Sequence, residues 1–458
     1  MSAVSANVSR TPAALTAPST ALQSFARAWQ ERSARWPDVD GPMRALRQAA
    51  MERFERLGLP TLRDESWHYS NLRALSARKF QTPTMPATVL DTAAPASWLD
   101  GLGAWPQIQL LNGVAPLGAL TAPAGMHVTS LRSMEQTDPQ RLAALLPALD
   151  DAEPQRWALL NTALFDDGLH IRIKGDCPVP LLIVHAMATG SAAEAQDMVQ
   201  PRVIIEVDRG ASAILIEHHL SEGPHAFLSN SVTSIALKET GRLEHFRVFS
   251  GSASATHTDL LQVHAASHSH LRQHTVVLSG GFVRTGLTAN LDAAGAMLDS
   301  YSLLTGHDSR HTDCVNIVRH AAPHTQSRQT ARIIASGRSR AIFNSKVVVN
   351  KGAQKADSLQ SCRGLLLSPT AEIDSRPQLE INADDVKCAH GATTGRLDPD
   401  MLFYMLSRGL DRNAAQSLLV FAFLADALTD MSLPAVRTAV ESQLIAQLPD
   451  SQLLRQFR

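Results

Sequence analysis

The chain has 458 residues, with 42 Lys or Arg against 43 Asp or Glu, and its formal net charge is −1. Such a balance provides no basic surface for nucleic acid or for an anionic membrane, so we expect neither as a partner. No apolar run reaches the roughly 20 residues that span a bilayer, and the 4 cysteines are far apart, as is typical of a reducing compartment. We therefore expect a cytoplasmic protein.

The first third of the chain is predicted to be mostly helical. Residues 1–20 are rich in Ser, Ala, Thr and Pro, and we expect them to form a disordered tail. Apolar residues then recur at helical spacing in several segments. We assign residues 1–165 to this N-terminal region. Its predicted elements are helices over 22–29, 43–54 and 139–165, strands over 108–111 and 126–131, and a linker over 81–95.

Between residues 166 and 395 the apolar period changes from that of a helix to that of a strand. Short segments rich in Val and Ile, such as Val203–Val207 and Lys346–Val349, alternate with Gly, Asn, Asp or Ser turns. The length is too great for one ordinary sandwich and predicts a closed or repetitive β architecture. A solenoid fits, because stacked strands bury faces that a single strand cannot bury alone.

The last region, residues 396–458, returns to helix. Asp398 is a predicted N-cap, Pro399 occupies the first helical position, and Gly409 ends the segment. A second amphipathic helix is predicted after Asp411. Two such helices either cap the core or dock a partner, and the pattern leaves both readings open.

The motifs of several enzyme classes are absent from the sequence. There is no Gly-x-x-x-x-Gly-Lys-Ser/Thr phosphate loop, so we do not expect the chain to hydrolyse ATP. His-Glu-x-x-His, Gly-x-Ser-x-Gly and Cys-x-x-Cys are also missing. The commonest zinc-protease, serine-hydrolase and dithiol redox classes are therefore not expected.

The segment 377–395 contains the most informative pair of residues. Cys388 and His390 lie two positions apart in a predicted strand, so their side chains share a face. A thiolate and an imidazole on one face can hold a soft or borderline metal or handle sulfur. The alternative is a buried cysteine packed beside a hydrogen-bonded histidine, and spacing alone favours that alternative.

Other histidines are numerous in the strand-rich region. They would bind zinc or iron only if the fold gathered them, and we expect most of them to be surface residues or packing partners. Cys177 is expected to be structural, and Cys314 lies between two of the histidine pairs. The histidines are His218, His219, His264, His268, His270, His274, His307, His311, His320 and His324.

Several blocks of the sequence resemble the SufB/SufD family of the SUF iron–sulfur cluster assembly system. Within that family, Gly391 after His390 differs from the His-Glu-Ala of SufB-type chains, and Arg63–Ser70 is similar to an element of SufD-type chains. The resemblance is therefore to SufD. The other blocks are 341–347, 365–374, 377–381, 383–393 and 402–409.

The resemblance implies a right-handed parallel β-helix core with helical regions at both ends. It implies a non-catalytic scaffold that pairs with a SufB-type paralogue through the β-helices, while a SufC-type ATPase hydrolyses ATP. The ATPase would dock on the C-terminal helices, and whether the isolated chain forms a homodimer stays open. The docking residues that we expect are Leu402, Phe403, Leu406 and Leu410.

The resemblance also suggests roles for three residues. His390 matches a family histidine thought to hold the nascent iron–sulfur cluster at the SufB interface, with Cys388 as a weaker candidate. We expect this cluster to be transient and no cofactor to be bound permanently. Cys362 falls where SufB-type chains have a sulfur-accepting cysteine, and we expect a neutral substitution.

Two alternatives remain at this point, besides a purely structural subunit in which His390 has no ligand role. One is a SufB-like scaffold that accepts sulfur on Cys362. The other is a β-helix carbohydrate-active enzyme, which needs a pair of carboxylates facing one bond. Asp384 and Asp385 are adjacent in the sequence, so in a strand they would face opposite ways and could not form that pair.

Overall fold

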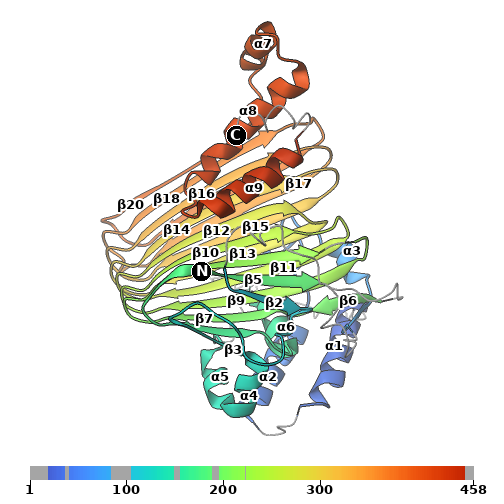
Figure 1. Ribbon diagram of the computed structural model, residues 1–458, viewed down its shortest axis with the longest axis vertical. Coiled ribbons are helices and arrows are strands. Elements are labelled where there is room, and N and C mark those ends of the chain that lie inside the picture. Colours follow the sequence, from blue (N-terminus) through green and yellow to red (C-terminus); the bar gives the residue numbers. More distant parts are fainter. Residues whose placement is uncertain are drawn as a thin grey trace, which may run out of the picture.

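The computed structural model describes residues 19–36, 41–83, 105–148, 155–187, 195–221 and 223–448. A tall stack of parallel strands forms its centre, with helices at both ends of the stack (Figure 1). The strands are β1 (Phe80–Gln81), β2 (Gln107–Leu111), β3 (Met126–Ser130), β4 (Leu169–Ile173), β5 (Asp176–Met187), β6 (Gln196–Val199), β7 (Arg202–Val207), β8 (Ser212–Ser221), β9 (Phe227–Leu237), β10 (Arg242–Ser250), β11 (Ala255–Ala265), β12 (His270–Ser279), β13 (Phe282–Leu291), β14 (Met297–Gly306), β15 (His311–His320), β16 (Gln326–Ala335), β17 (Arg340–Val349), β18 (Asp357–Leu366), β19 (Glu372–Ile381) and β20 (Lys387–Arg396).

The helices precede and follow the main run of strands. They are α1 (Thr20–Ser33), α2 (Pro42–Leu57), the 3-10 turn η1 (Glu65–Trp67), α3 (Arg73–Ser76), α4 (Leu131–Thr137), α5 (Pro139–Leu145), α6 (Arg156–Leu164), α7 (Pro399–Ser407), α8 (Arg412–Leu428) and α9 (Pro434–Ala446). No described helix is both long and apolar enough to cross a membrane.

The strands form two sheets, and from β7 onward the chain passes back and forth between them. Sheet 1 has the order β19-β17-β15-β13-β11-β9-β7-β4-β3, with β6 and β1 beside it, and sheet 2 has the order β2-β5-β8-β10-β12-β14-β16-β18-β20. Neighbours in the repeating part of each sheet are two strands apart in the sequence, so each turn of the coil adds one strand to each sheet. This arrangement confirms the predicted parallel β-helix core with helices at its two ends.

Successive coils stack in register, so equivalent residues form rows that run along the stack. One inward row of sheet 2 is the apolar series Leu243, Leu271 and Leu298, each almost fully buried. Burial of these apolar side chains between the sheets is the main favourable contribution to folding. A neighbouring inward row is polar, and it consists of His245, Gln273, Ser300, Gln329, Gln360 and His390.

The helices cover the outside of the coil. α8 and α9 pack their apolar residues, Val420 and Leu424 among them, on the outer face of sheet 2. α6 is buried from its second residue, Trp157, to its end and contacts β9 and α2. In Figure 1 the N-terminal helices lie at one end of the stack, whereas α7 projects beyond the other end.

The N-terminal region differs from the sequence expectation in detail. Residues 1–18 lie outside the described part of the chain, but Ser19 caps α1 and Thr20 is its first residue, so the expected tail is at least two residues shorter. The helix expected over 139–165 is two helices, α5 and α6, since Leu146 leaves the helical conformation. Most of the expected linker, residues 84–95, is also outside the described residues.

Candidate functional site

Both sheets stop at an unpaired strand at the same end of the coil. β20 pairs with β18 and β19 pairs with β17, and neither has a second neighbour in its sheet among the described residues. We call this end, formed by β19 and β20, the open end. An unpaired parallel edge presents free backbone N–H and C=O groups, with which a strand of another molecule can pair.

Cys388 and His390 lie on the inward face of β20. Their register partners on β18 are Ser358 and Gln360, which are buried in the interior of the coil. Paired residues of a parallel sheet point to the same face, so Cys388 and His390 point toward the coil axis as well. No further coil covers them in the described structure, and therefore His390 is exposed and Cys388 is half-buried.

The space beside His390 is open. A Cβ built on Gly391, the next residue, would meet no atom within 4 Å. Gly391 faces the opposite side of β20, so this free space lies on the outer face of the strand, and the imidazole itself is accessible because no coil covers it. Partial burial raises the pKa of the Cys388 thiol, so the thiol is protonated at neutral pH until a metal or a cationic group stabilises the thiolate.

Cys362 occupies a different environment, one coil inward. It lies on β18 beside Ala392 of β20, is 1% exposed, and contacts the Ser375 hydroxyl at 3.3 Å. Burial raises the pKa of its thiol to about 11. Cys362 is thus covered and protonated, which are the properties of a structural cysteine.

The segment Arg63–Ser70 connects the N-terminal region to sheet 1. The Arg284 guanidinium of β13 lies 3.6 Å from the centroid of the Trp67 ring and donates to the Ser66 carbonyl oxygen at 2.8 Å. Arg284 also forms an ion pair with Asp313, to which Ser70 donates a hydrogen bond. These partners could not be predicted from the sequence, because they are more than 200 residues away along the chain.

The segment Arg63–Ser70 also contacts the open end. The Glu65 carboxylate accepts hydrogen bonds from Arg376 at 2.8 Å and from Gln378 at 3.1 Å, both on β19. These bonds, led by the one from Gln378, hold the pKa of Glu65 below its ordinary value. The N-terminal element therefore supports the strand that forms half of the open end.

The expected docking helix is exposed as a whole. All nine residues of α7 are described and none is buried. Phe403 is 73% exposed and Tyr404 is 58% exposed, while Leu402, Leu406 and Leu410 are half-buried. Large apolar side chains in such positions mark an interaction surface.

The predicted histidines are not gathered into one site. Most have separate partners: for example, His264 bonds Asp292 at 2.8 Å and His270 bonds Asp299 at 2.8 Å. Among the described residues, one group of three side chains is close enough to hold a metal, and it combines His219 with His185 and Glu217. Sequence analysis missed the last two, since they come together only through the stacking of β5 on β8.

The acidic pair does not lie in a strand, contrary to the expectation. Asp384 and Asp385 are in the bend between β19 and β20, because β20 begins only at Lys387. Asp385 forms an ion pair with Lys355 of the adjacent coil. One carboxylate of the pair is thus already engaged, and the arrangement gives no support to the carbohydrate-active alternative.

Comparisons with known proteins agree on one family. The family model described as "SUF system FeS cluster assembly, SufBD core domain" matches residues 188–423. The chain is 29% identical to the iron–sulfur cluster assembly protein SufD of Escherichia coli (strain K12), over 88% of this chain and 92% of that protein. It is 28% identical to the SufBD family protein slr0076 of Synechocystis, over 85% and 88% of the two chains.

A plant relative is more distant. The chain is 22% identical to the chloroplastic protein ABCI7 of Arabidopsis thaliana, over 84% of this chain and 82% of that protein. The matched core model covers the coil from the segment before β6 to within α8. The chain therefore belongs to the SufBD family and is a SUF-system subunit of iron–sulfur cluster assembly.

Proposed function

We propose that the chain is a non-catalytic scaffold that pairs with a SufB-type paralogue through its open end and holds a nascent iron–sulfur cluster there with His390. One observation carries this proposal: an inward-facing imidazole lies uncovered on an unpaired strand. The cluster is cargo that the complex builds and passes on. In this proposal the coil of residues 166–395 is the scaffold, residues 1–165 brace it, and residues 396–458 dock a partner.

The chemistry of the open end suits such cargo. A neutral imidazole is an occasional ligand of iron–sulfur clusters, whereas thiolates are the usual ones. His390 can supply one ligand, and a thiolate of the paralogue the others. Cys388 would join only after losing its proton, which the positive charge of iron favours. His390 is therefore the primary ligand in our proposal and Cys388 the secondary one.

The C-terminal helices have two separate roles in this proposal. α8 and α9 cover the apolar outer face of sheet 2, whereas α7 offers Phe403, Tyr404 and the flanking leucines to a SufC-type ATPase. ATP hydrolysis by that partner agrees with the lack of a phosphate loop in this chain. We place the complex in the cytoplasm, since all four cysteines, each in the described part, are free.

The test of the cluster site uses the copurified complex. His390→Ala should strongly reduce cluster content without preventing subunit association, Cys388→Ser should have an intermediate effect, and Cys362→Ser should have little. Cluster content is measured by anaerobic absorption together with iron and acid-labile sulfide analysis. Wild-type cluster content in His390→Ala would contradict the proposal, and complete loss in Cys362→Ser would favour the sulfur-accepting alternative.

The docking role of α7 needs a milder change than removal of the C-terminal region. Deleting residues 396–458 would uncover the outer face of sheet 2 and destabilise the coil. Phe403→Ser with Tyr404→Ser should instead abolish ATPase capture and leave the melting temperature unchanged, because both side chains are exposed. Asp400→Asn on the same helix is the control. Unchanged capture by the double variant would contradict the docking assignment.

A further inference from the structure

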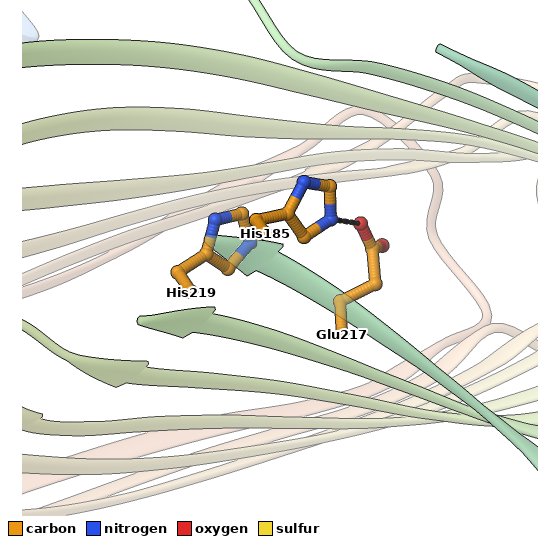
Figure 2. A group of neighbouring side chains, drawn as sticks. All are labelled: His185, Glu217 and His219. Atoms are coloured by element: carbon orange, nitrogen blue, oxygen red, sulfur yellow. Dashed lines mark hydrogen bonds and ion pairs between the residues drawn. The ribbon is translucent and has the colours of Figure 1, made fainter. Parts of the chain in front are cut away.

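A group of ionisable side chains is enclosed inside the coil, far from the open end. His185 of β5 and Glu217 and His219 of β8 place ligand atoms within 4.8 Å of one another, and none of the three is more than 5% exposed. Figure 2 shows the His185 ring turned toward the Glu217 carboxylate, with the His219 ring beside it. The two imidazoles are register partners and stack, with ring centroids 4.3 Å apart.

Glu217 is the anchor of this group. It accepts hydrogen bonds from His185 Nε2 at 2.8 Å, from His245 Nε2 at 2.8 Å and from the Thr233 hydroxyl at 2.9 Å. A neutral imidazole that donates its Nε2–H in such a bond keeps a lone pair on Nδ1. Neither Nδ1 atom has a partner among the described residues.

His219 and the neighbouring His257 have still fewer partners. Both ring nitrogens of each are buried and make no hydrogen bond with any described residue. The closest charged group to His219 is the Asp259 carboxylate, 3.9 Å from its Nε2, and Asp259 is already paired with Arg247. Buried polar atoms nearly always have partners in proteins. Six unpaired imidazole nitrogens around one carboxylate are therefore not explained by the contacts of this chain.

We propose that His185, Glu217 and His219 hold a divalent first-row transition metal, with zinc and ferrous iron the two ions that suit this donor set. Imidazole and carboxylate are ligands that both ions accept. Ligand atoms around a four-coordinate ion at about 2.1 Å are roughly 3.4 Å apart, so the three side chains, whose ligand atoms lie within 4.8 Å of one another, need small rotamer changes to bind an ion.

This ion would be separate from the assembly cargo. Six strand-to-strand steps in sheet 2 separate β8 from β20, which at about 4.8 Å per step is roughly 29 Å. No cysteine belongs to the group, so the ion is mononuclear and carries no sulfide. Since the ligands are enclosed, the ion would have to bind during folding, while the coils of β5, β8 and β10 stack. Once bound, it would hold those coils together.

The decisive variant is His219→Phe. The His219 ring stacks on Phe249 at 4.4 Å and makes no hydrogen bond, so a phenyl ring fits the stack and removes only the ligand nitrogens. Without an ion the variant should be at least as stable as the wild type; with an ion it should lose the metal and become less stable. Glu217→Gln is the second variant.

The matched control is His274→Phe. His274 is equally buried and stacks on Phe246 at 4.5 Å, but it lies on the opposite, outer face of sheet 2. The full chain is expressed in defined media with zinc or with iron under anaerobic conditions. Metal and acid-labile sulfide are then quantified, and a cobalt-grown sample is examined for d–d absorption bands.

The expected result is about one ion per chain without matching sulfide in the wild type and in His274→Phe. We expect the metal content to fall at least about tenfold in His219→Phe and Glu217→Gln. The medium that gives full occupancy identifies the ion. A wild type with neither a native ion nor cobalt bands overturns the proposal, as does a His219→Phe variant with unchanged metal content. Iron that is accompanied by acid-labile sulfide and is lost in His390→Ala would belong to the cluster site, and it would not count as the ion of the enclosed site.

Discussion

His245 and His390 belong to the same inward row of sheet 2, yet their surroundings are opposite. His245 is fully buried and bonded to Glu217, whereas His390 is exposed at the uncovered end of the coil. The residue type, the strand face and the register are the same, and only the covering by further coils differs. In a stacked coil, the layer in which a residue lies decides whether its side chain is enclosed or exposed.

The cysteines of sheet 2 show the same contrast. Cys362 lies one layer below the surface of the stack, and burial raises the pKa of its thiol to about 11. Cys388 lies in the last layer and is half-buried, and there too burial raises the pKa of the thiol. A single layer separates a thiol that is enclosed from one that a partner can reach.

The largest effect should come from removing the anchor of the enclosed layer. Glu217→Ala leaves the donors of His185, His245 and Thr233 buried without an acceptor, and it should cost about 3–5 kcal/mol of stability. The midpoint of urea unfolding measures this loss. A change below about 1 kcal/mol would show that the enclosed layer is not held together by its carboxylate.

Acid should weaken the covered layers next. Burial lowers the pKa of His320 to about 4, so the folded protein keeps this imidazole neutral while the unfolded chain, with a pKa near 6.5, takes up a proton. Stability contributed by His320 is therefore complete above pH 6.5 and falls as the pH drops toward 4, by about 3 kcal/mol in all. Asp357, the charged group that acts on His320, partly offsets the shift.

The pH dependence can be assigned with one variant. His320 bonds the hydroxyls of Thr325 at 2.8 Å and Ser327 at 2.9 Å, and His320→Gln keeps a polar group there that does not titrate. Unfolding midpoints of this variant should depend less on pH between 6.5 and 4 than those of the wild type. Identical pH profiles would show that the acid sensitivity arises elsewhere.

The rate of thiol alkylation should differ between Cys388 in the last layer and Cys362 in the layer beneath it. The thiolate fraction of Cys362 is about 100-fold below that of a thiol with the ordinary pKa of 9.0, and its side chain is covered. Cys388 in the native chain should react with iodoacetamide at least about 10-fold faster, as measured by mass spectrometry of peptides. Equal rates would mean that the coil opens readily at β18.

The smallest effect is expected for His390→Ala on stability. The imidazole is exposed, so its removal should change the free energy of unfolding by no more than about 0.5 kcal/mol. Gln360→Ala, at the adjacent covered position of the same row, should cost more, because Gln360 donates to Ser345 at 3.1 Å in the interior. Equal changes in the free energy of unfolding for the two variants would contradict the distinction between covered and open layers.

The sequence predicted those features that depend on nearby residues. Asp398 and Asp411 cap α7 and α8, with side chains that accept from the N–H groups of Asp400 at 2.8 Å and Ala414 at 2.9 Å. The spacing of Cys388 and His390 likewise placed both on one face of β20. Such inferences need only the periods of helix and strand.

The features that the sequence did not predict depend on which coils stack. His185 and His219 are register partners although 34 residues separate them, and the turns between strands vary in length, so no fixed repeat indicates the match. The contacts of Arg63–Ser70 with β13, β15 and β19 could not be predicted from the sequence for the same reason. Rows in a solenoid follow from register, which becomes visible only in three dimensions.

The late position of β20 in the chain has a consequence for biosynthesis. Every strand of sheet 2 after β2 pairs with one made earlier, and β20 is the last of them to leave the ribosome. A chain that ends before residue 387 can stack its earlier coils but lacks both Cys388 and His390. Products terminated before β20 would thus have the shape of the scaffold without the end that we propose binds the cluster, and only chains that extend through β20 could present it to a partner.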